Sequence, residues 1–173
     1  VSATESEIKM LQNFIGENGS SGSALKNLNT FRNEEGLKGV YLTSEGVAPE
    51  TEQWGTIALT CAAEEVSFRS NWKKQQWGSS VLDFWDDFSS DGILEDRPAN
   101  GENKPMASLA QLQTIPAGES RVFEFYLTWF FPNQKAWSKS ILKKYYATQY
   151  ADAWDVIRKV KPNLTDLEHQ TIR

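Results

Sequence analysis

Cysteine and histidine are almost absent from this chain, which has one of each, Cys61 and His169. A single cysteine forms no intrachain disulfide, so a disulfide-stapled secreted module is excluded. A single histidine supplies no His-rich metal site, and a Ser-His-Asp relay would have to use His169. We interpret His169 as a solvent-facing helix residue. Cys61 alternates with apolar residues, so we expect it to be a buried side chain and not a nucleophile.

Long apolar runs and widespread positive charge are also missing. No run approaches the roughly 18 apolar residues that cross a bilayer, so we expect no transmembrane segment. The net charge of -5 and the pI near 5.0 argue against a nucleic-acid partner, which needs clustered lysine and arginine. The one basic cluster, residues 135–144, is interpreted as a solvated segment, with a binding patch as the alternative. We expect a cytoplasmic location, although a chain that starts at Val1 leaves targeting signals unread.

Aromatic residues are abundant, and their strongest pattern lies between Met106 and Asn133. Alternate residues of 121–131 are apolar, which predicts an antiparallel strand with one buried face. That ridge consists of Phe123, Phe125, Leu127, Trp129 and Phe131. Residues 116–118, Pro-Ala-Gly, supply a turn, so 106–115 is predicted to be the partner strand of a β-hairpin. A ridge of this length needs a second layer, and we expect another sheet to cover it.

Shorter apolar segments predict further strands. They are Leu37–Thr43 with Val40 and Leu42 inward, Gly55–Cys61, Val66–Trp72, and residues 8–16, which also fit a short helix but which we interpret as a strand that ends at Gly16. Gly55–Cys61 and Val66–Trp72 alternate well and are predicted to form a second hairpin. Residues 17–35 are rich in Gly, Ser and Asn, and we expect a mobile surface loop there.

Two segments have helical spacing instead. Residues 79–92 predict a short amphipathic helix that ends at Gly92. Its expected inner face is Val81, Leu82, Trp85 and Phe88, and its expected outer face is Asp83, Asp86 and Asp87. After Asp152 the apolar residues step by three and four, with a break expected at Pro162 and a new cap at Asn163 or Thr165. The predicted fold class is mainly β: an antiparallel β-sandwich, residues 1–150, with a short amphipathic helix and a C-terminal helical segment, residues 151–173.

Acidic residues between positions 83 and 96 are the main candidates for catalysis. A glycosidase needs two carboxyl groups about 5 to 9.5 Å apart across a sugar, and Asp83 with Asp86 or Asp87 could reach that separation. A solvated polar helix face explains the same residues, and we favour it. The spacing of a calcium loop and a Gly-rich phosphate loop are both missing. The sequence therefore indicates no catalytic, metal-binding or cofactor-binding residue.

Seven tryptophans are the unusual feature of the composition. Exposed tryptophans would stack on sugar rings and make the chain a carbohydrate-binding module, whereas buried ones would fill the core. Trp85 and Trp129 lie on apolar stripes and are predicted to be core residues. The four that we leave open, as possible sugar-platform or interdomain aromatics, are Trp54, Trp72, Trp77 and Trp137.

An ordered set of motifs resembles a known family. The set is Trp54-Gly-Thr-Ile-Ala-Leu, Val66-Ser-Phe, Asp83-Phe-Trp-Asp-Asp-Phe with Asp91-Gly, Pro116-Ala-Gly-Glu-Ser-Arg, Phe131-Pro-Asn, and Tyr145-Tyr with Asp152-Ala-Trp. From about residue 12 to residue 173, the chain resembles the N-terminal domain of the non-lysosomal glucosylceramidase, or bile-acid β-glucosidase, family, glycoside hydrolase family 116.

The resemblance implies a non-catalytic β-sandwich domain of a retaining β-glucosidase that packs against an (α/α)6 catalytic barrel of the same polypeptide. No catalytic residue carries over, because the nucleophile and the acid/base of the family belong to the barrel. Residues 151–173 would connect to that barrel, which this chain does not contain, and the domain could contact the glucoside substrate. The family's domain is longer than this chain, so we expect an unpaired strand edge and weak self-association. The alternatives are a carbohydrate-binding module and an independent hydrolase that uses Asp83 with Asp86 or Asp87.

Overall fold

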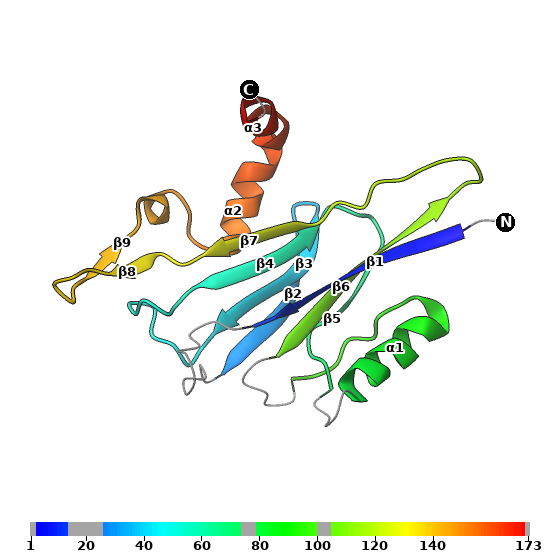
Figure 1. The fold of residues 1–173 in the computed structure, drawn as a ribbon, viewed down its shortest axis with the longest axis horizontal. Coiled ribbons are helices and arrows are strands. Elements are labelled where there is room, and N and C mark those ends of the chain that lie inside the picture. The colour runs from blue at the N-terminus through cyan, green and yellow to red at the C-terminus, as the bar shows by residue number, and fades with distance from the viewer. Residues whose placement is uncertain (1–2, 14–25, 74–78, 100–104, 172–173) are drawn as a thin grey trace.

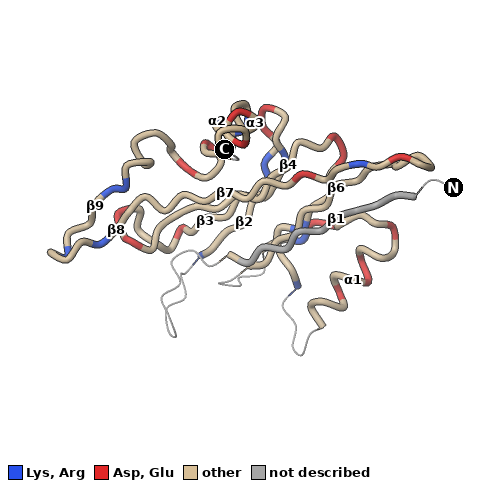
Figure 2. The backbone as a smooth tube through the Cα atoms, turned by 45° about the horizontal axis from the view of Figure 1, so that its top comes forward, with Lys and Arg blue, Asp and Glu red and all other residues tan. Residues whose placement is uncertain are grey.

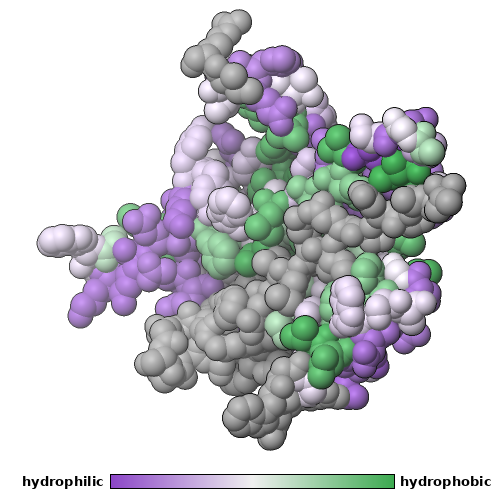
Figure 3. All heavy atoms as spheres, turned by 45° about the vertical axis from the view of Figure 1, so that its right-hand side comes forward, coloured by the Kyte–Doolittle hydropathy of each residue, from purple (hydrophilic) through white to green (hydrophobic). Residues whose placement is uncertain are grey.

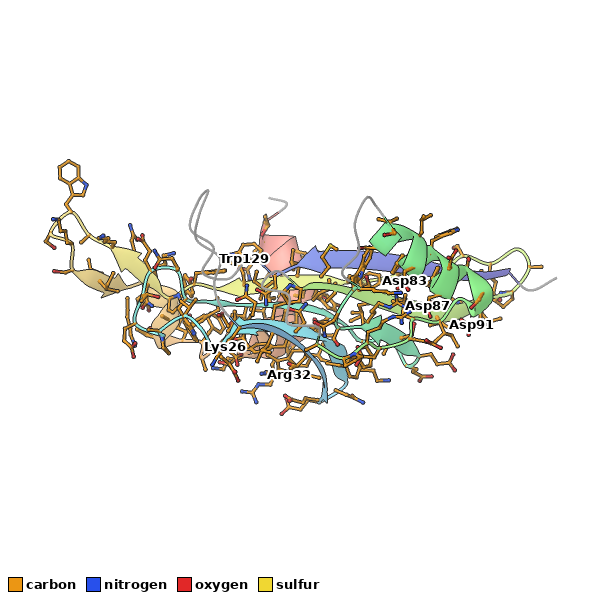
Figure 4. The ribbon with its side chains drawn as sticks, turned by 90° about the horizontal axis from the view of Figure 1, so that it is seen from below. Lys26, Arg32, Asp83, Asp87, Asp91 and Trp129 are labelled. Carbon is orange, nitrogen blue, oxygen red and sulfur yellow. The ribbon has the colours of Figure 1, made fainter. Side chains whose placement is uncertain are left out.

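Two antiparallel sheets pack face to face, and one helix lies on the outer face of each (Figure 1). The computed structural model describes residues 3–13, 26–73, 79–99 and 105–171. The elements form layers in the order α1 (Ser79–Asp91), the three-stranded sheet, the four-stranded sheet and α2 (Ala153–Val160) (Figure 4). The predicted class, a mainly β antiparallel sandwich, is confirmed.

Antiparallel pairing joins every strand to its neighbours. The four-stranded sheet has the order β2 (Asn27–Glu34), β3 (Leu37–Ser44), β4 (Thr56–Cys61), β7 (Tyr126–Phe130). The three-stranded sheet has the order β1 (Ala3–Gln12), β6 (Met106–Ile115), β5 (Val66–Arg69). A separate two-stranded hairpin is formed by β8 (Asn133–Lys135) and β9 (Ile141–Lys143).

Helices occupy the two predicted segments. They are α1 (Ser79–Asp91), and then α2 (Ala153–Val160) and α3 (Leu164–Thr171), with 3-10 turns η1 (Tyr145–Thr148) and η2 (Lys161–Asn163). The stop at Gly92 is confirmed, since its φ is 78° and its N–H donates to the Phe88 carbonyl. Pro162 produces the expected break as a 3-10 turn. The new cap predicted at Asn163 or Thr165 is wrong, because the backbone stays helical at Leu164.

The main core lies between the two sheets. Its buried apolar side chains are Val40, Leu42, Leu59 and Cys61 from one sheet and Ala107 and Leu109 from the other. Phe31 stacks on Phe68 across the interface, with ring centroids 3.9 Å apart. The inward positions of Val40, Leu42 and Cys61 are thus as predicted. Gly39 allows β3 to approach β4 closely, since a Cβ there would lie 2.1 Å from the Leu59 carbonyl oxygen.

Both predicted hairpins are wrong. β6 and β7 belong to different sheets, and so do β4 and β5. The turn at 116–118 exists, with Gly118 at φ 81° and the Glu119 N–H donating to the Pro116 carbonyl. Residues 116–125 then carry the chain across the sandwich. Alternation identified the strands but not their partners, because strands of both sheets bury alternate side chains in the same core.

The loop predicted over residues 17–35 is wrong for its second half, where β2 forms. A two-residue turn, Glu35 and Gly36 with φ of 51° and 76°, joins β2 to β3 as a true hairpin. Residues 14–25 lie outside the described part of the chain. β1 confirms the first predicted strand, which ends at Gln12 instead of Gly16.

Candidate functional site

Helix α1 exposes most of the face that the sequence predicted to be buried, although Phe88 packs inward as predicted. Phe84 is buried and stacks on Trp72 with ring centroids 4.5 Å apart. Val81, Leu82 and Trp85, expected to face inward, are 57%, 62% and 57% exposed. The space-filling view shows hydrophobic atoms exposed on its lower part, where α1 lies (Figure 3). This face of the helix is therefore apolar and open to solvent.

A buried arginine explains the reversed orientation. Arg69 in β5 is 0% exposed, and its guanidinium lies 2.5 Å from an Asp87 oxygen and 3.3 Å from an Asp83 oxygen. Figure 4 shows both aspartates on the side of α1 that faces the sheets. Arg97 adds a second contact to Asp83, at 3.3 Å. A buried charge needs partners, so the helix turns its acids inward and Arg69 is neutralised.

These ion pairs decide what the acidic residues can do. The favoured interpretation, a solvated polar face, is wrong for Asp83 and Asp87 and confirmed for Asp86, which is exposed. A glycosidase needs one free carboxylate and one carboxyl group that can donate a proton. Because Asp83 and Asp87 both contact one guanidinium, the pair serves to attach α1 to β5.

Two further acids of this region, Asp91 and Asp96, stabilise the loop that follows α1. Asp96 accepts hydrogen bonds from the backbone N–H and the hydroxyl of Ser70, at 2.8 and 2.6 Å. Asp91 accepts from the Ile93 N–H at 2.8 Å. Across the described ranges, no group of three His, Cys, Asp or Glu side chains is arranged to hold a metal ion.

The tryptophans whose role the sequence left undecided have different environments. Trp72 is 7% exposed and donates its indole N–H to the Ser108 hydroxyl at 2.8 Å, so it is a core residue. Trp54 is partly buried against the cluster under α2. Trp137 is fully exposed in the turn between β8 and β9. Trp77 lies outside the described residues.

Two tryptophans predicted to be core residues are exposed. Trp85 lies on the outer face of α1. Trp129 is 63% exposed on β7, beside Leu127. Its side of the sheet is the one that faces the three-stranded sheet, since it pairs with Ile57 of the inter-sheet core (Figure 4). β7 is an edge strand, so Trp129 extends past the covering layer.

The start of α2 is fixed firmly to the four-stranded sheet. Asp152 caps the helix by accepting from the Asp155 N–H at 2.7 Å, and the Ala153 N–H donates to the Thr56 hydroxyl at 2.9 Å. Trp154 is buried beneath the helix. The Asp152-Ala-Trp motif thus joins the C-terminal segment to the sandwich.

Asp155 carries the largest electrostatic perturbation in this segment. Burial alone would raise the pKa of its carboxyl, but hydrogen bonds from Lys159 and Arg158, both 2.7 Å long, and from the Ala151 N–H outweigh that effect. The pKa of Asp155 falls to about 2. The cluster therefore stabilises the first turns of α2.

A cleft of about 480 Å³ lies where α2 and α3 leave the sheet, and sequence reasoning did not indicate it. Glu124, Tyr126 and Arg158 contribute to its walls. Burial, with the nearby Glu124 carboxylate, raises the pKa of the Tyr126 hydroxyl. The mixed charges of the lining suit a polar partner.

Comparison with known proteins gives one family. The family model described as beta-glucosidase 2, glycosyl-hydrolase family 116 N-term matches residues 2–167. No curated protein matches the chain. None of the helices in the described ranges has the length and apolar character needed to cross a membrane.

Proposed function

Since the chain belongs to glycosyl hydrolase family 116 as its N-terminal domain, we propose that it is a non-catalytic β-sandwich domain of a retaining β-glucosidase of the glucosylceramidase type. It packs against an (α/α)6 catalytic barrel of the same polypeptide. Residues 151–173 form the connector to that barrel, and the domain helps to shape the approach of the glucoside substrate.

The ion pairs of Arg69 are the observation that carries this proposal. Asp83 and Asp87, the best catalytic candidates in the sequence, are held by a buried arginine. Their geometry supports a structural role. The exposed apolar residues Val81, Leu82 and Trp85 on α1 add support, because large apolar side chains exposed together on one element commonly mark an interface.

Aspartate variants of the native enzyme test the proposal. We expect Asp83→Asn to leave kcat and KM for an aryl β-glucoside unchanged at temperatures where the variant is folded, as judged by circular dichroism. Asp86→Asn, an exposed neighbour, is the matched control. A folded Asp83→Asn enzyme that has lost its kcat would overturn the proposal. NMR of the first-formed anomer tests the retaining mechanism, which requires β-glucose as the initial product.

The alternative is a carbohydrate-binding module, and the full exposure of Trp137 favours it. An aromatic platform would change its fluorescence when a sugar stacks on it. Saturable quenching by glucose or cellobiose that disappears in Trp137→Ala would support this alternative. Unchanged emission at high sugar concentration would contradict it.

The cytoplasmic location remains a separate prediction. Fractionation of cells that express the native enzyme tests it, with a known cytoplasmic protein as the marker. Recovery of the enzyme from the secreted fraction would contradict it.

A further inference from the structure

A hairpin arm, residues 133–145, projects from one end of the sandwich (Figure 1). Trp137 lies fully exposed in its turn. Leu142 is 56% exposed, and Ile141 and Tyr145 are exposed as well. Exposed apolar residues concentrated on so small an element indicate a surface that a partner covers.

The arm is also the most positively charged part of an acidic domain. Between Glu124 and Asp152 the sequence contains no Asp or Glu but four lysines, whereas the whole chain has a net charge of -5. Figure 2 shows basic residues on β8 and β9, with acidic residues beside the base of the arm, where the Glu52 carboxylate accepts a hydrogen bond from the Lys135 N–H at 3.3 Å. The complementary surface on a partner is therefore acidic.

The base of the arm is held firmly. The Asn133 side chain donates to the carbonyls of Pro49 and Thr51 at 2.8 and 2.7 Å. The Lys144 N–H donates to the Pro132 carbonyl at 2.7 Å. The sandwich presents the tip in a fixed direction.

The two faces of the arm differ. Ile141 and Leu142 are consecutive in β9 and point to opposite faces. Lys135 pairs with Ile141 and shares its face, as does Lys143, two residues further along. One face therefore carries Lys135 and Lys143 beside Ile141, and the other carries Leu142. A flat surface would contact one face only, whereas a groove contacts both faces and the tip.

We propose that the arm inserts into a groove of the catalytic domain of the same polypeptide. Carboxylates on one wall face Lys135 and Lys143, and an apolar wall receives Leu142 and Trp137. This inference rests on the proposed function, since it names the element through which the domain docks. Attachment within one polypeptide gives the groove a high effective concentration at the arm.

Zero-length cross-linking of the intact native enzyme tests the proposal. A carbodiimide joins a lysine directly to a carboxylate that contacts it, and mass spectrometry identifies the pair. We expect Lys135 or Lys143 to link to an Asp or Glu outside residues 1–173. Trp137→Ala should lower the yield by roughly tenfold, the effect of losing one interface anchor. Val122→Ala, which removes an exposed apolar side chain from the loop between β6 and β7, is the control variant, and Lys26 is the control lysine.

The other outcomes are distinguishable. If other lysines of the domain link to the catalytic domain but those of the arm do not, this inference is wrong and the proposed function stands. If no lysine of the domain forms such a link, docking itself is wrong. An anionic membrane is the competing partner. Co-sedimentation of the enzyme with phosphatidylserine vesicles that is lost in Trp137→Ala would assign the arm to a lipid surface and overturn the inference.

Discussion

Arg69 combines complete burial with two carboxylate partners, and its removal takes the guanidinium away from the largely buried Asp87, whereas Asp83 keeps its contact with Arg97. We expect Arg69→Ala to lower the free energy of unfolding by about 3–5 kcal/mol, the usual cost of breaking a buried pair. Arg121→Ala, which breaks an exposed pair with Glu119, should cost about 0–1 kcal/mol. Urea unfolding followed by tryptophan fluorescence measures both. Equal costs would contradict the structural role of Arg69.

Asp155 makes the free energy of unfolding depend on pH. Its pKa is about 2 when folded, below the ordinary value of 3.8, so the folded protein binds fewer protons between these values. The stabilisation is complete above about pH 4 and is lost as the pH falls toward 2. Asp155→Asn should remove on the order of 1–2 kcal/mol at pH 7 and reduce the loss of stability between pH 4 and pH 2. Asp166→Asn, an exposed control in α3, should keep the wild-type slope, and an unchanged slope in Asp155→Asn would contradict the assignment.

At the scale of elements, α1 has apolar residues on more than one side, and the sequence pattern placed Val81, Leu82 and Trp85 on the buried side although they are exposed. Periodicity counts apolar residues but takes no account of a buried arginine on a distant strand. Arg69 outweighs the exposure of Val81, Leu82 and Trp85, because an unpaired buried charge costs more than partly exposed apolar surface. The sequence pattern predicted α1 and its end at Gly92. The contacts with Arg69 determine which face of the helix is buried.

The orientation of α1 predicts an unusual ranking of two adjacent substitutions. Phe84→Ala should destabilise the protein by about 3–5 kcal/mol, since the ring is buried against Trp72. Trp85→Ala removes a larger side chain but should change stability by no more than about 0.5 kcal/mol, because that residue is on the surface. Thermal or urea unfolding of both variants gives the ranking. If Trp85→Ala destabilised the protein more than Phe84→Ala, Trp85 would be on the buried face of α1, as the sequence pattern suggested.

β2 shows why a strand can escape sequence analysis. Its buried residues Asn27 and Asn29 are polar, so the alternation that identifies strands is weak. The Asn29 side chain donates to the carbonyls of Ser70 and Pro105, both at 3.0 Å, and it accepts from the Asn13 amide at 3.1 Å. Hydrogen bonds between distant segments replace apolar packing there. Such partners are known only once the chain has folded.

At the scale of the whole molecule, the sequence predicted the sandwich and its family but not which surfaces remain open. The motif residues have structural roles: Asp83 and Asp87 attach α1 to Arg69 of β5, and Asp152 caps α2. Exposure of Trp85, Trp129 and Trp137 depends on where each sheet ends and where the arm projects. These are properties of the assembled layers, which local periodicity does not contain.

The edge strand β7 gives the last prediction. Within the described four-stranded sheet, β7 pairs with β4 on one side and with no strand on the other. Trp129 and Leu127 lie exposed beside this open edge. Unpaired backbone groups next to apolar side chains favour edge-to-edge pairing, so the 173-residue chain should associate weakly as its concentration rises. Light scattering over a concentration series measures this association. Trp129→Lys should weaken it, because a charge at a sheet edge opposes pairing, whereas Trp85→Lys on α1 should not. A monodisperse monomer at high concentration would show that this edge does not pair.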